Sequence, residues 1–314
     1  MGNVRVGIIG GGNRGKGHIR SLQGFDDVDV VAVCDQIAEA RAGVCSDFGI
    51  EGQYDAVETM LEQADLDAVF VTTPPHLNGK LALPCLEAGV HTLIEKPPGL
   101  SVAETEGLKA AADRTGAKAM VGWNRRFNTF IVEARDRVLA RGPVTQLVGE
   151  FHKSITQLAN SGKFTEAMMD QMFLETPIHS VDTIRFLADS EVAEVHAYVR
   201  RSMSKYRDVH AALVVFENGA VAQMIHNYTT SARLERYEIH GHDISAYLEG
   251  VNRGEIFCEG ERQEIGSGSG GTDEQNRFFI DCVKNDTPVG LPGANLEEAV
   301  KTMALAEAIL EGTR

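Results

Sequence analysis

The sequence predicts two domains: an α/β domain built on a parallel sheet, followed by an α+β domain built on an open, predominantly antiparallel sheet. The 314 residues are enough for two domains of ordinary size, each with its own core. Up to residue 122, short apolar strands alternate with helical patterns, which is typical of a parallel sheet covered on both faces. Beyond it, strands follow one another with short turns. We therefore expect one domain over residues 1–122 and a second over residues 123–314.

The first domain is expected to contain five strands, each a short apolar run. They are Val4–Ile9, Val28–Cys34, Ala68–Thr72, Val90–Ile94 and Lys118–Gly122. Between them, apolar residues recur at helical spacing from Ile37 to Phe48, and a further helix is expected near Leu77–Ala88. Ser101 and Glu104 form a capping box that starts an alanine-rich helix ending near Arg114.

The second domain is expected to combine helices with a run of strands. The helices are Thr129–Ala140, Pro177–Leu187, Glu274–Val283 and Leu296–Leu310. The strands are Gln146–Phe151, Val195–Arg200, Val209–Phe216, Ala220–Tyr228, Tyr237–Gly241 and Ile244–Glu249. Residues 154–172 show no regular pattern, and the Gly/Ser run at 266–271 indicates a flexible loop. The last helix, 296–310, is expected to pack back on the first domain.

Composition and charge exclude several classes of protein. The chain is 43% hydrophobic and 24% charged, the balance of a soluble globular protein. Its net charge of −15 and pI of about 5.1 repel phosphate backbones, so no nucleic-acid partner is expected. The same charge disfavours strongly anionic substrates, unless a local arginine cluster overrides it.

Nothing in the sequence indicates a membrane or an oxidising compartment. No apolar run approaches the roughly 20 residues that span a bilayer, and the first residues lead directly into a strand rather than a signal peptide. The five cysteines are scattered without a CxxC pair, which argues against a disulfide framework and a structural zinc site. We expect a cytoplasmic protein that holds no metal and contacts no membrane.

A glycine-rich turn follows the first strand. Gly10, Gly12 and Gly15 match the GxGxxG pattern between a strand and a helix. The first glycine permits a tight turn, the second lets the backbone approach a pyrophosphate, and the third lets the helix pack on the strand. The helix N-terminus offers N–H groups and a positive dipole to the phosphates. The pattern predicts a Rossmann domain that binds a dinucleotide, with Asn13 and Arg14 also in the binding loop.

The end of the second strand indicates which dinucleotide is bound. Asp35 stands there, twenty residues after Gly15. Its carboxylate is placed to accept hydrogen bonds from the adenosine ribose hydroxyls and to repel a 2′-phosphate. Gln36, rather than a basic residue, follows it. We therefore predict NAD as the cofactor, with NADP left open because Arg14 is able to reach a phosphate.

Further motifs extend along nearly the whole chain. Glu95-Lys96-Pro97 follows the fourth strand, and Thr72-Thr73-Pro74 follows the third. Residues 122–127, Gly-Trp-Asn-Arg-Arg-Phe, come after the fifth strand, and His179 with Asp182 falls on a later helix. In this combination the chain resembles the Gfo/Idh/MocA oxidoreductases. The resemblance implies a Rossmann domain joined to an open antiparallel sheet domain, and NAD(P)-dependent hydride transfer.

Lys96, His179 and Glu175 are the catalytic residues that the resemblance implies. Oxidation of an alcohol needs a base for the hydroxyl proton and a group that stabilises the developing oxyanion. Lys96 lies where a strand's carboxyl end meets the cofactor crevice, and histidine, with an unperturbed pKa near 6.5, suits proton exchange at neutral pH. Members of the inositol dehydrogenase type carry Asp four residues before the histidine, whereas this chain carries Glu175. We expect Glu175 to orient His179 or to bind a substrate hydroxyl, and the departure leaves the substrate open.

The remaining candidates are contacts of the cofactor and of the substrate. Expected cofactor contacts are Thr73, Pro74, Glu95 and Lys96. Arg126 matches a substrate-site arginine of the inositol dehydrogenases, although a structural salt bridge fits it equally well. Trp123 either shapes the nicotinamide pocket or belongs to the core. Tyr228, at a strand end, is expected to contact the substrate.

The expected function is hydride transfer between nicotinamide and a secondary alcohol or ketone of a sugar or cyclitol. Two alternatives stay open. One is a redox-assisted sugar lyase or hydrolase that uses NAD transiently, and the other is a non-catalytic NAD(P)-binding sensor. A sensor would need neither Lys96 nor His179, and both are present.

Two further structural features are predicted. The strand Val209–Phe216 is apolar on both faces, whereas a single helical layer covers only one face of an antiparallel sheet. We therefore expect a homodimer or homotetramer that forms through the sheet. The bond between Lys96 and Pro97 is predicted to be cis, because only X–Pro bonds adopt this form at little cost and relatives show it at this motif.

Overall fold

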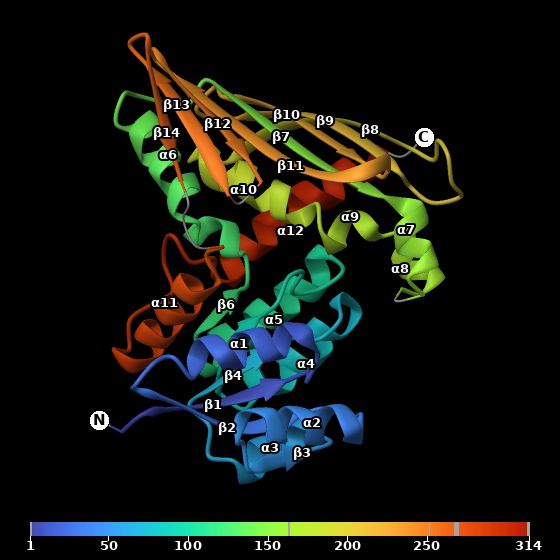
Figure 1. Cartoon of the computed structure of the whole chain (residues 1–314), viewed down its shortest axis with the longest axis vertical. Helices are drawn as coiled ribbons and strands as arrows, with labels where there is room; N and C mark the ends of the chain where they lie inside the picture. Colours follow the sequence, from blue (N-terminus) through green and yellow to red (C-terminus); the bar gives the residue numbers. More distant parts are fainter. Residues whose placement is uncertain (1, 163, 251, 267–269, 313–314) are drawn as a thin grey trace. The chain divides into compact units, whose positions relative to one another are not determined.

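The computed structural model describes residues 2–162, 164–250, 252–266 and 270–312 (Figure 1). The chain forms two compact units, residues 1–124 with 272–301 and residues 125–271 with 302–314. The first break falls two residues after the predicted boundary. Thr272–Lys301 also belongs to the first unit, whereas the sequence placed this segment in the second domain and expected only the helix 296–310 to pack back on the first. Residues 267–269 of the predicted loop lie outside the described residues.

A six-stranded parallel sheet forms the centre of the first unit. Its strands are β1 (Val4–Ile9), β2 (Val28–Cys34), β3 (Gly52–Tyr54), β4 (Ala68–Val71), β5 (His91–Ile94) and β6 (Ala119–Val121). In the order β3-β2-β1-β4-β5-β6, the chain moves outward from β1 in one direction and resumes at β4 on its other side. Ligands of open α/β sheets bind at the carboxyl ends of the strands at such a switch point. The sequence missed β3, because three residues carry too little pattern.

Helices flank this sheet, and their residue types explain where they begin. They are α1 (Asn13–Leu22), α2 (Ala38–Phe48), α3 (Val57–Gln63), α4 (Pro75–Glu87), α5 (Val102–Thr115) and α11 (Thr272–Lys284). Ser101 caps α5 as predicted, because its hydroxyl accepts from the Glu104 backbone N–H at 3.1 Å. The ring of Phe70 on β4 lies 5.4 Å from His18 of α1 and 5.7 Å from Phe279 of α11. These contacts place α1 and α11 on the same face of the sheet.

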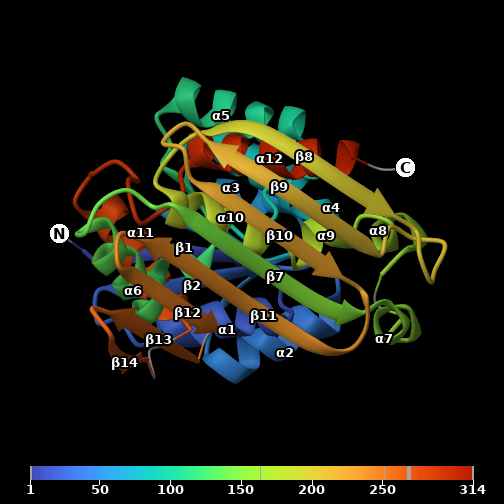
Figure 2. The same ribbon diagram turned by 90° about the horizontal axis from the view of Figure 1, so that it is seen from above.

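The second unit contains an eight-stranded sheet, seen from above in Figure 2. Its strands are β7 (Gln146–Ser154), β8 (Val192–Arg200), β9 (Val209–Phe216), β10 (Val221–Asn227), β11 (Thr229–Gly241), β12 (Ile244–Glu249), β13 (Arg253–Cys258) and β14 (Glu261–Ile265). The order is β14-β13-β12-β11-β7-β10-β9-β8, and every neighbouring pair is antiparallel except β7 with β10. β11 begins eight residues before its predicted start, and neither β13 nor β14 was among the predicted strands.

The helices of this unit cover one face of its sheet. They are α6 (Thr129–Leu139), α7 (Ile155–Asn160), α8 (Glu166–Met169), α9 (Met172–Glu175) and α10 (Ile178–Ala188), and α12 (Leu296–Glu311) begins in the first unit and ends in the second. Short helices therefore occupy much of residues 154–172, where no pattern was evident. α10 packs closely on β7 at Gly149, where an added Cβ would lie 2.8 Å from Ser180 Oγ and 2.9 Å from Ile184 Cγ1. This approach fixes the helix that carries His179.

The other face of the sheet exposes large apolar side chains. Tyr198, Leu213, Ile225, Tyr247 and Phe257 are 37–49% exposed, and the strand register places all five on this face. Inward residues of β9 such as Val214 and Phe216 are buried, so the predicted alternation of its two apolar faces is confirmed. We call these five residues the outer apolar face.

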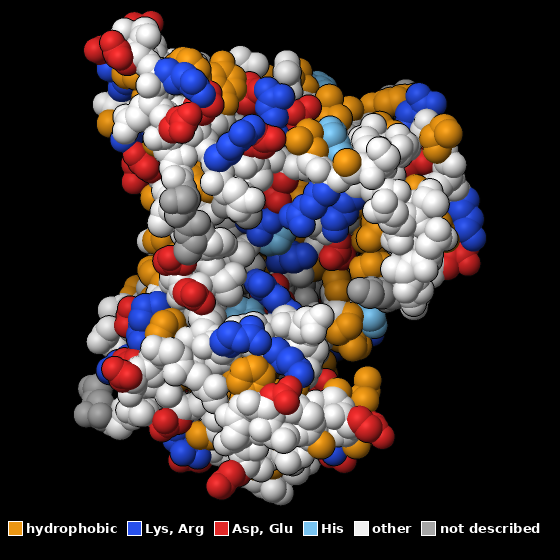
Figure 3. Space-filling view, viewed as in Figure 1, with side chains coloured by type: hydrophobic (Ala, Val, Ile, Leu, Met, Phe, Trp, Pro, Cys, Tyr) orange, Lys and Arg blue, Asp and Glu red, His pale blue; other side chains and the backbone are white. Residues whose placement is uncertain are grey.

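Two further surface properties follow from the structure. On the face drawn in Figure 3, several basic side chains lie next to one another near the middle of the view, and most acidic side chains lie toward the outline. None of the described helices is both long and apolar enough to cross a membrane.

A pair of buried histidines lies in the core of the second unit. His210 on β9 and His226 on β10 are directly opposite each other, and their rings lie 4.8 and 5.1 Å from that of Phe173. Burial lowers the pKa of His210 to about 4 and that of His226 well below its usual range. Both imidazoles are therefore neutral in the folded protein at neutral pH.

Mild acid should destabilise the protein through these histidines. An unfolded histidine titrates near 6.5, so between pH 6.5 and about 4 the unfolded state binds more protons, and stability falls as the pH falls. For His210 alone the loss reaches about 3 kcal/mol at pH 4. Urea midpoints measured from pH 7 to 4.5 should fall more steeply in the wild type than in His210→Leu. The matched variant His242→Leu, at an exposed turn histidine, should keep the wild-type slope; equal slopes in all three proteins would contradict the assignment.

Candidate functional site

The glycine loop between β1 and α1 is shaped by close packing on one side and open space on the other. Gly10 has a φ of +102°, which side-chain-bearing residues rarely adopt. A Cβ on Gly15 would lie 2.1 Å from the Gly10 carbonyl oxygen, so only glycine fits there. A Cβ on Gly12 would meet no atom within 4 Å, and Gly12 directly precedes the first turn of α1. The loop therefore leaves the helix N-terminus accessible to a pyrophosphate.

Asp35 is fixed beside this loop by backbone hydrogen bonds. Its Oδ2 accepts from the Gly11 N–H at 2.7 Å, and its Oδ1 accepts from the Ile37 N–H at 2.8 Å. Each oxygen keeps a further lone pair for a ribose hydroxyl. The loop and this carboxylate together fit NAD. Arg41, which was not among the predicted site residues, donates to the Asp35 carbonyl.

Glu95 joins the glycine-loop helix to the strand that ends in the Glu-Lys-Pro motif. Its Oε1 is 2.6 Å from Arg14 Nη2 and 3.0 Å from His18 Nε2, and the other ring nitrogen of His18 lies 3.0 Å from Asn276 Oδ1 on α11. Burial raises the pKa of Glu95, but Arg14 and His18 outweigh it and lower the pKa to about 2. Glu95 is therefore a buried carboxylate with a structural pairing, and Arg14 is held against it.

Asn78 holds the backbone on both sides of Lys96. Its fully buried amide donates to the carbonyl oxygens of Glu95 at 2.8 Å and Pro97 at 3.0 Å, and its Oδ1 accepts from the Thr73 hydroxyl at 2.9 Å. No role was expected for Asn78 from its position in the sequence. The Lys96–Pro97 bond is cis, as predicted. Lys96 itself is only partly buried.

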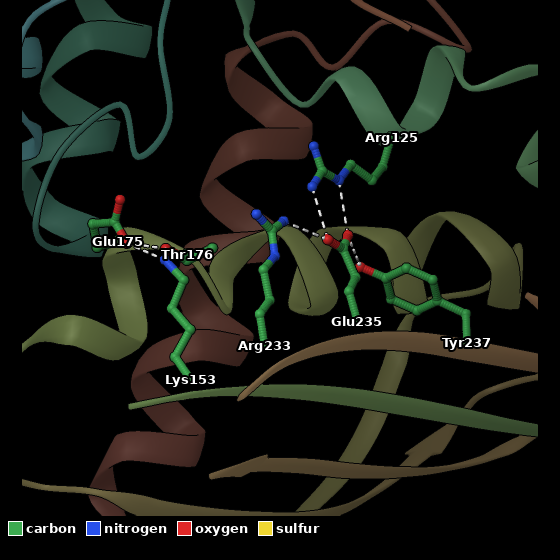
Figure 4. Close-up of polar contacts among 7 residues, drawn as sticks. All are labelled: Arg125, Lys153, Glu175, Thr176, Arg233, Glu235 and Tyr237. Atoms are coloured by element: carbon green, nitrogen blue, oxygen red, sulfur yellow. Dashed lines mark hydrogen bonds and ion pairs between the residues drawn. The ribbon is translucent and has the colours of Figure 1, made fainter. Parts of the chain in front are cut away.

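The second unit places His179 in the first turn of α10. Its backbone N–H donates to the Thr176 carbonyl at 3.0 Å, and only 6% of the residue is exposed. Glu175 ends the preceding helix, and its Oε2 accepts from the Thr176 hydroxyl and lies 3.5 Å from Lys153 Nζ (Figure 4). Lys153 also donates to Thr176 Oγ1 at 2.6 Å. A lysine that the sequence did not single out thus contacts the candidate Glu175.

Arg125, Glu235 and Tyr237 form a buried polar cluster next to these residues (Figure 4). Arg125 makes two 2.9 Å hydrogen bonds to the Glu235 carboxylate, and the Tyr237 hydroxyl donates to the same carboxylate at 3.0 Å. Burial opposes ionisation, but the bonds from Arg125 lower the pKa of Glu235. Arg233 adds a fourth bond to Glu235, at 2.9 Å. Arg125 is far from Glu235 in the sequence, so no local sequence pattern predicted this cluster.

The three residues that the sequence proposed as substrate contacts are all buried in the structure. Arg126 is 1% exposed and forms a two-bond salt bridge with Asp182, at 2.8 Å for each bond. The Tyr228 hydroxyl donates to the Met172 carbonyl at 2.7 Å in an apolar cluster, and Trp123 is fully buried. The salt bridge of Arg126 matches the structural alternative that its place in the sequence left open.

Comparison with known protein families matches both parts of the chain. Residues 4–123 match an oxidoreductase family with an NAD-binding Rossmann fold, and residues 139–247 match the GFO/IDH/MocA C-terminal domain. Scyllo-inositol 2-dehydrogenase (NAD(+)) from Bacillus subtilis is 28% identical over 91% of this chain and 88% of that protein. Inositol 2-dehydrogenase 1 from Saccharopolyspora erythraea is 32% identical over 69% of this chain and 64% of that protein.

Solved structures share the fold over nearly the whole chain. Levoglucosan dehydrogenase in complex with NADH superposes with a TM-score of 0.86 at 18% identity, covering 99% of this chain and 96% of that one. UDP-N-acetylglucosamine 3-dehydrogenase from Acidithiobacillus ferrooxidans gives a TM-score of 0.85 at 22% identity, covering 100% and 98%. At these identities the likeness concerns the fold, and it confirms the predicted fold class.

Removal of the Asp35 carboxylate should weaken NAD binding. Asp35→Ala loses charged hydrogen-bond acceptors for the ribose and the bond to the Gly11 N–H, so the Kd for NADH should rise about 10- to 100-fold. Fluorescence titration with NADH measures this change. Asp47→Ala removes an exposed aspartate of α2 and should leave the Kd unchanged. An unchanged Kd in Asp35→Ala, or tenfold tighter binding of NADPH than of NADH to the wild type, would refute the assignment.

Proposed function

Because the chain belongs to the Gfo/Idh/MocA oxidoreductase family, we propose that it transfers a hydride between NAD and a secondary alcohol or ketone of a sugar or cyclitol. The matching family domains carry this proposal, since the first is described as NAD-binding and together they span most of the chain. Relatives named inositol 2-dehydrogenase support the substrate class. The residues at the glycine loop and Asp35 fit NAD, as described above.

In the proposed reaction, Lys96 and His179 act on the same substrate hydroxyl, each in a different role. NAD, when bound, accepts the hydride from the carbinol carbon. Lys96 holds the oxygen and stabilises the negative charge that develops on it, and His179 takes the hydroxyl proton. The two groups serve the same proton transfer, so their roles are exchangeable. We assign Glu175 to the same site, where it orients the imidazole or a neighbouring hydroxyl.

A single assay separates this proposal from its alternatives. Absorbance at 340 nm is followed while the enzyme and NAD are mixed with a panel of sugars and cyclitols. A dehydrogenase accumulates NADH, a redox-assisted lyase forms product without net NADH, and a sensor does neither. Product without NADH, or neither signal for every compound, would contradict the proposal.

Loss of either proton-transfer group should abolish most turnover. Lys96→Ala and His179→Ala should each lower kcat by 10²- to 10⁴-fold, the usual contribution of one positioned acid or base. Their Kd for NADH should stay nearly unchanged, because the glycine loop and Asp35 are intact. Glu175→Gln should lower kcat by a smaller factor. Lys109→Ala, at a surface ion pair on α5, serves as the control. Near-normal turnover in both alanine variants would overturn the mechanism.

The outer apolar face supports a homo-oligomer. We propose that a second copy of the chain covers Tyr198, Leu213 and Ile225, because a monomer would leave these apolar side chains in water. The protein is then a homodimer or a homotetramer formed through this sheet.

A charged side chain introduced on the outer apolar face should dissociate the oligomer into monomers. Light scattering at micromolar concentration should report an oligomer for the wild type and a monomer for Leu213→Glu, since a glutamate at the interface would be buried without a partner. Met203→Glu, at a residue that is 80% exposed outside this face, should stay oligomeric. A monomeric wild type would contradict the proposal.

We also propose a cytoplasmic location. All five cysteines are free, and Cys34, Cys45, Cys85 and Cys282 are buried. Free thiols of this kind suit a reducing compartment.

A further inference from the structure

The cationic side chains of Lys153 and Arg233 extend from the inner face of the second sheet and point in the same direction. Lys153 comes from β7 and Arg233 from β11, and Figure 4 shows both side chains extending away from the strands in the same direction. Their charged groups lie over one aromatic ring, with Lys153 Nζ 5.9 Å and the Arg233 guanidinium carbon 5.5 Å from the centre of Phe151. The two like charges are therefore held close together.

Among the residues drawn in Figure 4, cations outnumber carboxylates. Arg125, Lys153 and Arg233 supply three cations to the cluster in Figure 4, whereas Glu175 and Glu235 supply two anions. Glu235 already accepts two bonds from Arg125 and one from Tyr237, and it takes a single bond from Arg233.

The two cations differ in exposure in a way that suits a ligand. The Arg233 side chain is 57% exposed, and among the described residues its guanidinium donates only to Glu235, so other N–H groups are available to a ligand. Lys153 is more buried, with 20% of its side chain exposed. Burial lowers the pKa of Lys153, and the charge of Arg233 lowers it further, whereas Glu175 opposes both. An anion placed between the two cations would relieve their repulsion and replace lost hydration.

This cluster also adjoins the turn that carries His179. Lys153 donates to the Thr176 hydroxyl, and the Thr176 carbonyl accepts the backbone N–H of His179. A group bound by Lys153 would therefore lie next to the segment that we assign to proton transfer. The chain as a whole carries a net charge of −15, so a local excess of positive charge here is not a general property of its surface.

We propose that Lys153 and Arg233 bind an anionic group of the substrate, a carboxylate or a phosphate ester, so that the preferred substrate is an acidic sugar or cyclitol rather than a neutral one. The inference rests on the proposed function, because it takes the inner face of this sheet as the substrate side. Arginine binds carboxylates and phosphates through paired N–H groups, and lysine adds a point charge. The pair then determines specificity, and the hydride-transfer chemistry stays with Lys96 and His179.

Calorimetric titration of the whole protein saturated with NADH tests this directly. The ligands are matched sets that share a carbon skeleton: hexoses and inositols as neutral members, hexuronates and hexonates as carboxylates, and hexose and inositol phosphates as phosphate esters. The variants are Lys153→Met and Arg233→Met, which keep much of the apolar stem. The controls are Lys205→Met and Arg137→Met, which each remove a surface ion pair with a glutamate in the same unit. Thermal unfolding reports whether each variant is folded.

We expect at least one acidic ligand to bind the wild type at least tenfold more tightly than its neutral counterpart. Each test variant should weaken that binding about 10- to 100-fold, with less than a threefold change for the neutral ligand. The control variants should bind as the wild type does. Preference for carboxylates or for phosphates identifies the anionic group. If neutral ligands bind as tightly as every acidic one, or if the acidic ligand binds folded test variants normally, the inference is overturned.

Parallel assays at 340 nm keep this inference separable from the proposed function. Tight binding of an acidic ligand that is lost in the variants, without NADH formation, would support the anion site while contradicting the dehydrogenase. NADH formation from neutral compounds alone, unchanged in Lys153→Met, would support the dehydrogenase and overturn the anion site. If Lys153→Met unfolds, Lys153→Gln and the single variant Arg233→Met decide the outcome, because Arg233 is the more exposed of the pair.

Discussion

The buried carboxylate of Glu95 is the constraint on which the candidate site of the first unit depends. A charge removed from water is stable only when it is paired and hydrogen-bonded, and Arg14 and His18 supply that pairing. Both partners belong to α1, the helix that begins at the glycine loop, so one carboxylate ties this loop to the strand that ends in Lys96. Loss of one member of a buried ion pair typically costs on the order of 3–5 kcal/mol. The glycine loop and Lys96 are therefore held together through Glu95.

The second unit repeats this principle with a different balance of charge. Glu235 is also a buried carboxylate held by an arginine, Arg125, and by the Tyr237 hydroxyl. Around Glu95, the protein's own side chains pair the carboxylate fully. Around Glu235, the nearby Lys153 and Arg233 bring more positive charges than the carboxylates of that cluster pair. A completed cluster serves the fold, and an uncompensated one is suited to a ligand. This contrast assigns the first cluster to positioning and the second to recognition.

Local sequence patterns predicted the features that depend on interactions between neighbouring residues. Strand bounds at β1, β2, β9 and β12, the cap at Ser101 and the glycine loop were predicted from spacing alone, because neighbouring residues determine them. Contacts between distant residues were not predictable in this way, as Asn78 with Pro97 and Arg125 with Glu235 illustrate. The burial of Arg126 and Tyr228 was not predictable for the same reason, since it depends on packing between elements that no sequence window spans.

Hydride transfer is the central claim, and isotope tracing tests it most directly. The enzyme is given NAD and the sugar or cyclitol that yields most NADH, deuterated at every carbon, and the NADH formed is weighed by mass spectrometry. The account predicts that each NADH gains one deuterium, because the hydride comes from the carbinol carbon, and that His179→Ala forms the same labelled product far more slowly. Unlabelled NADH, or product formed without any NADH, would contradict it.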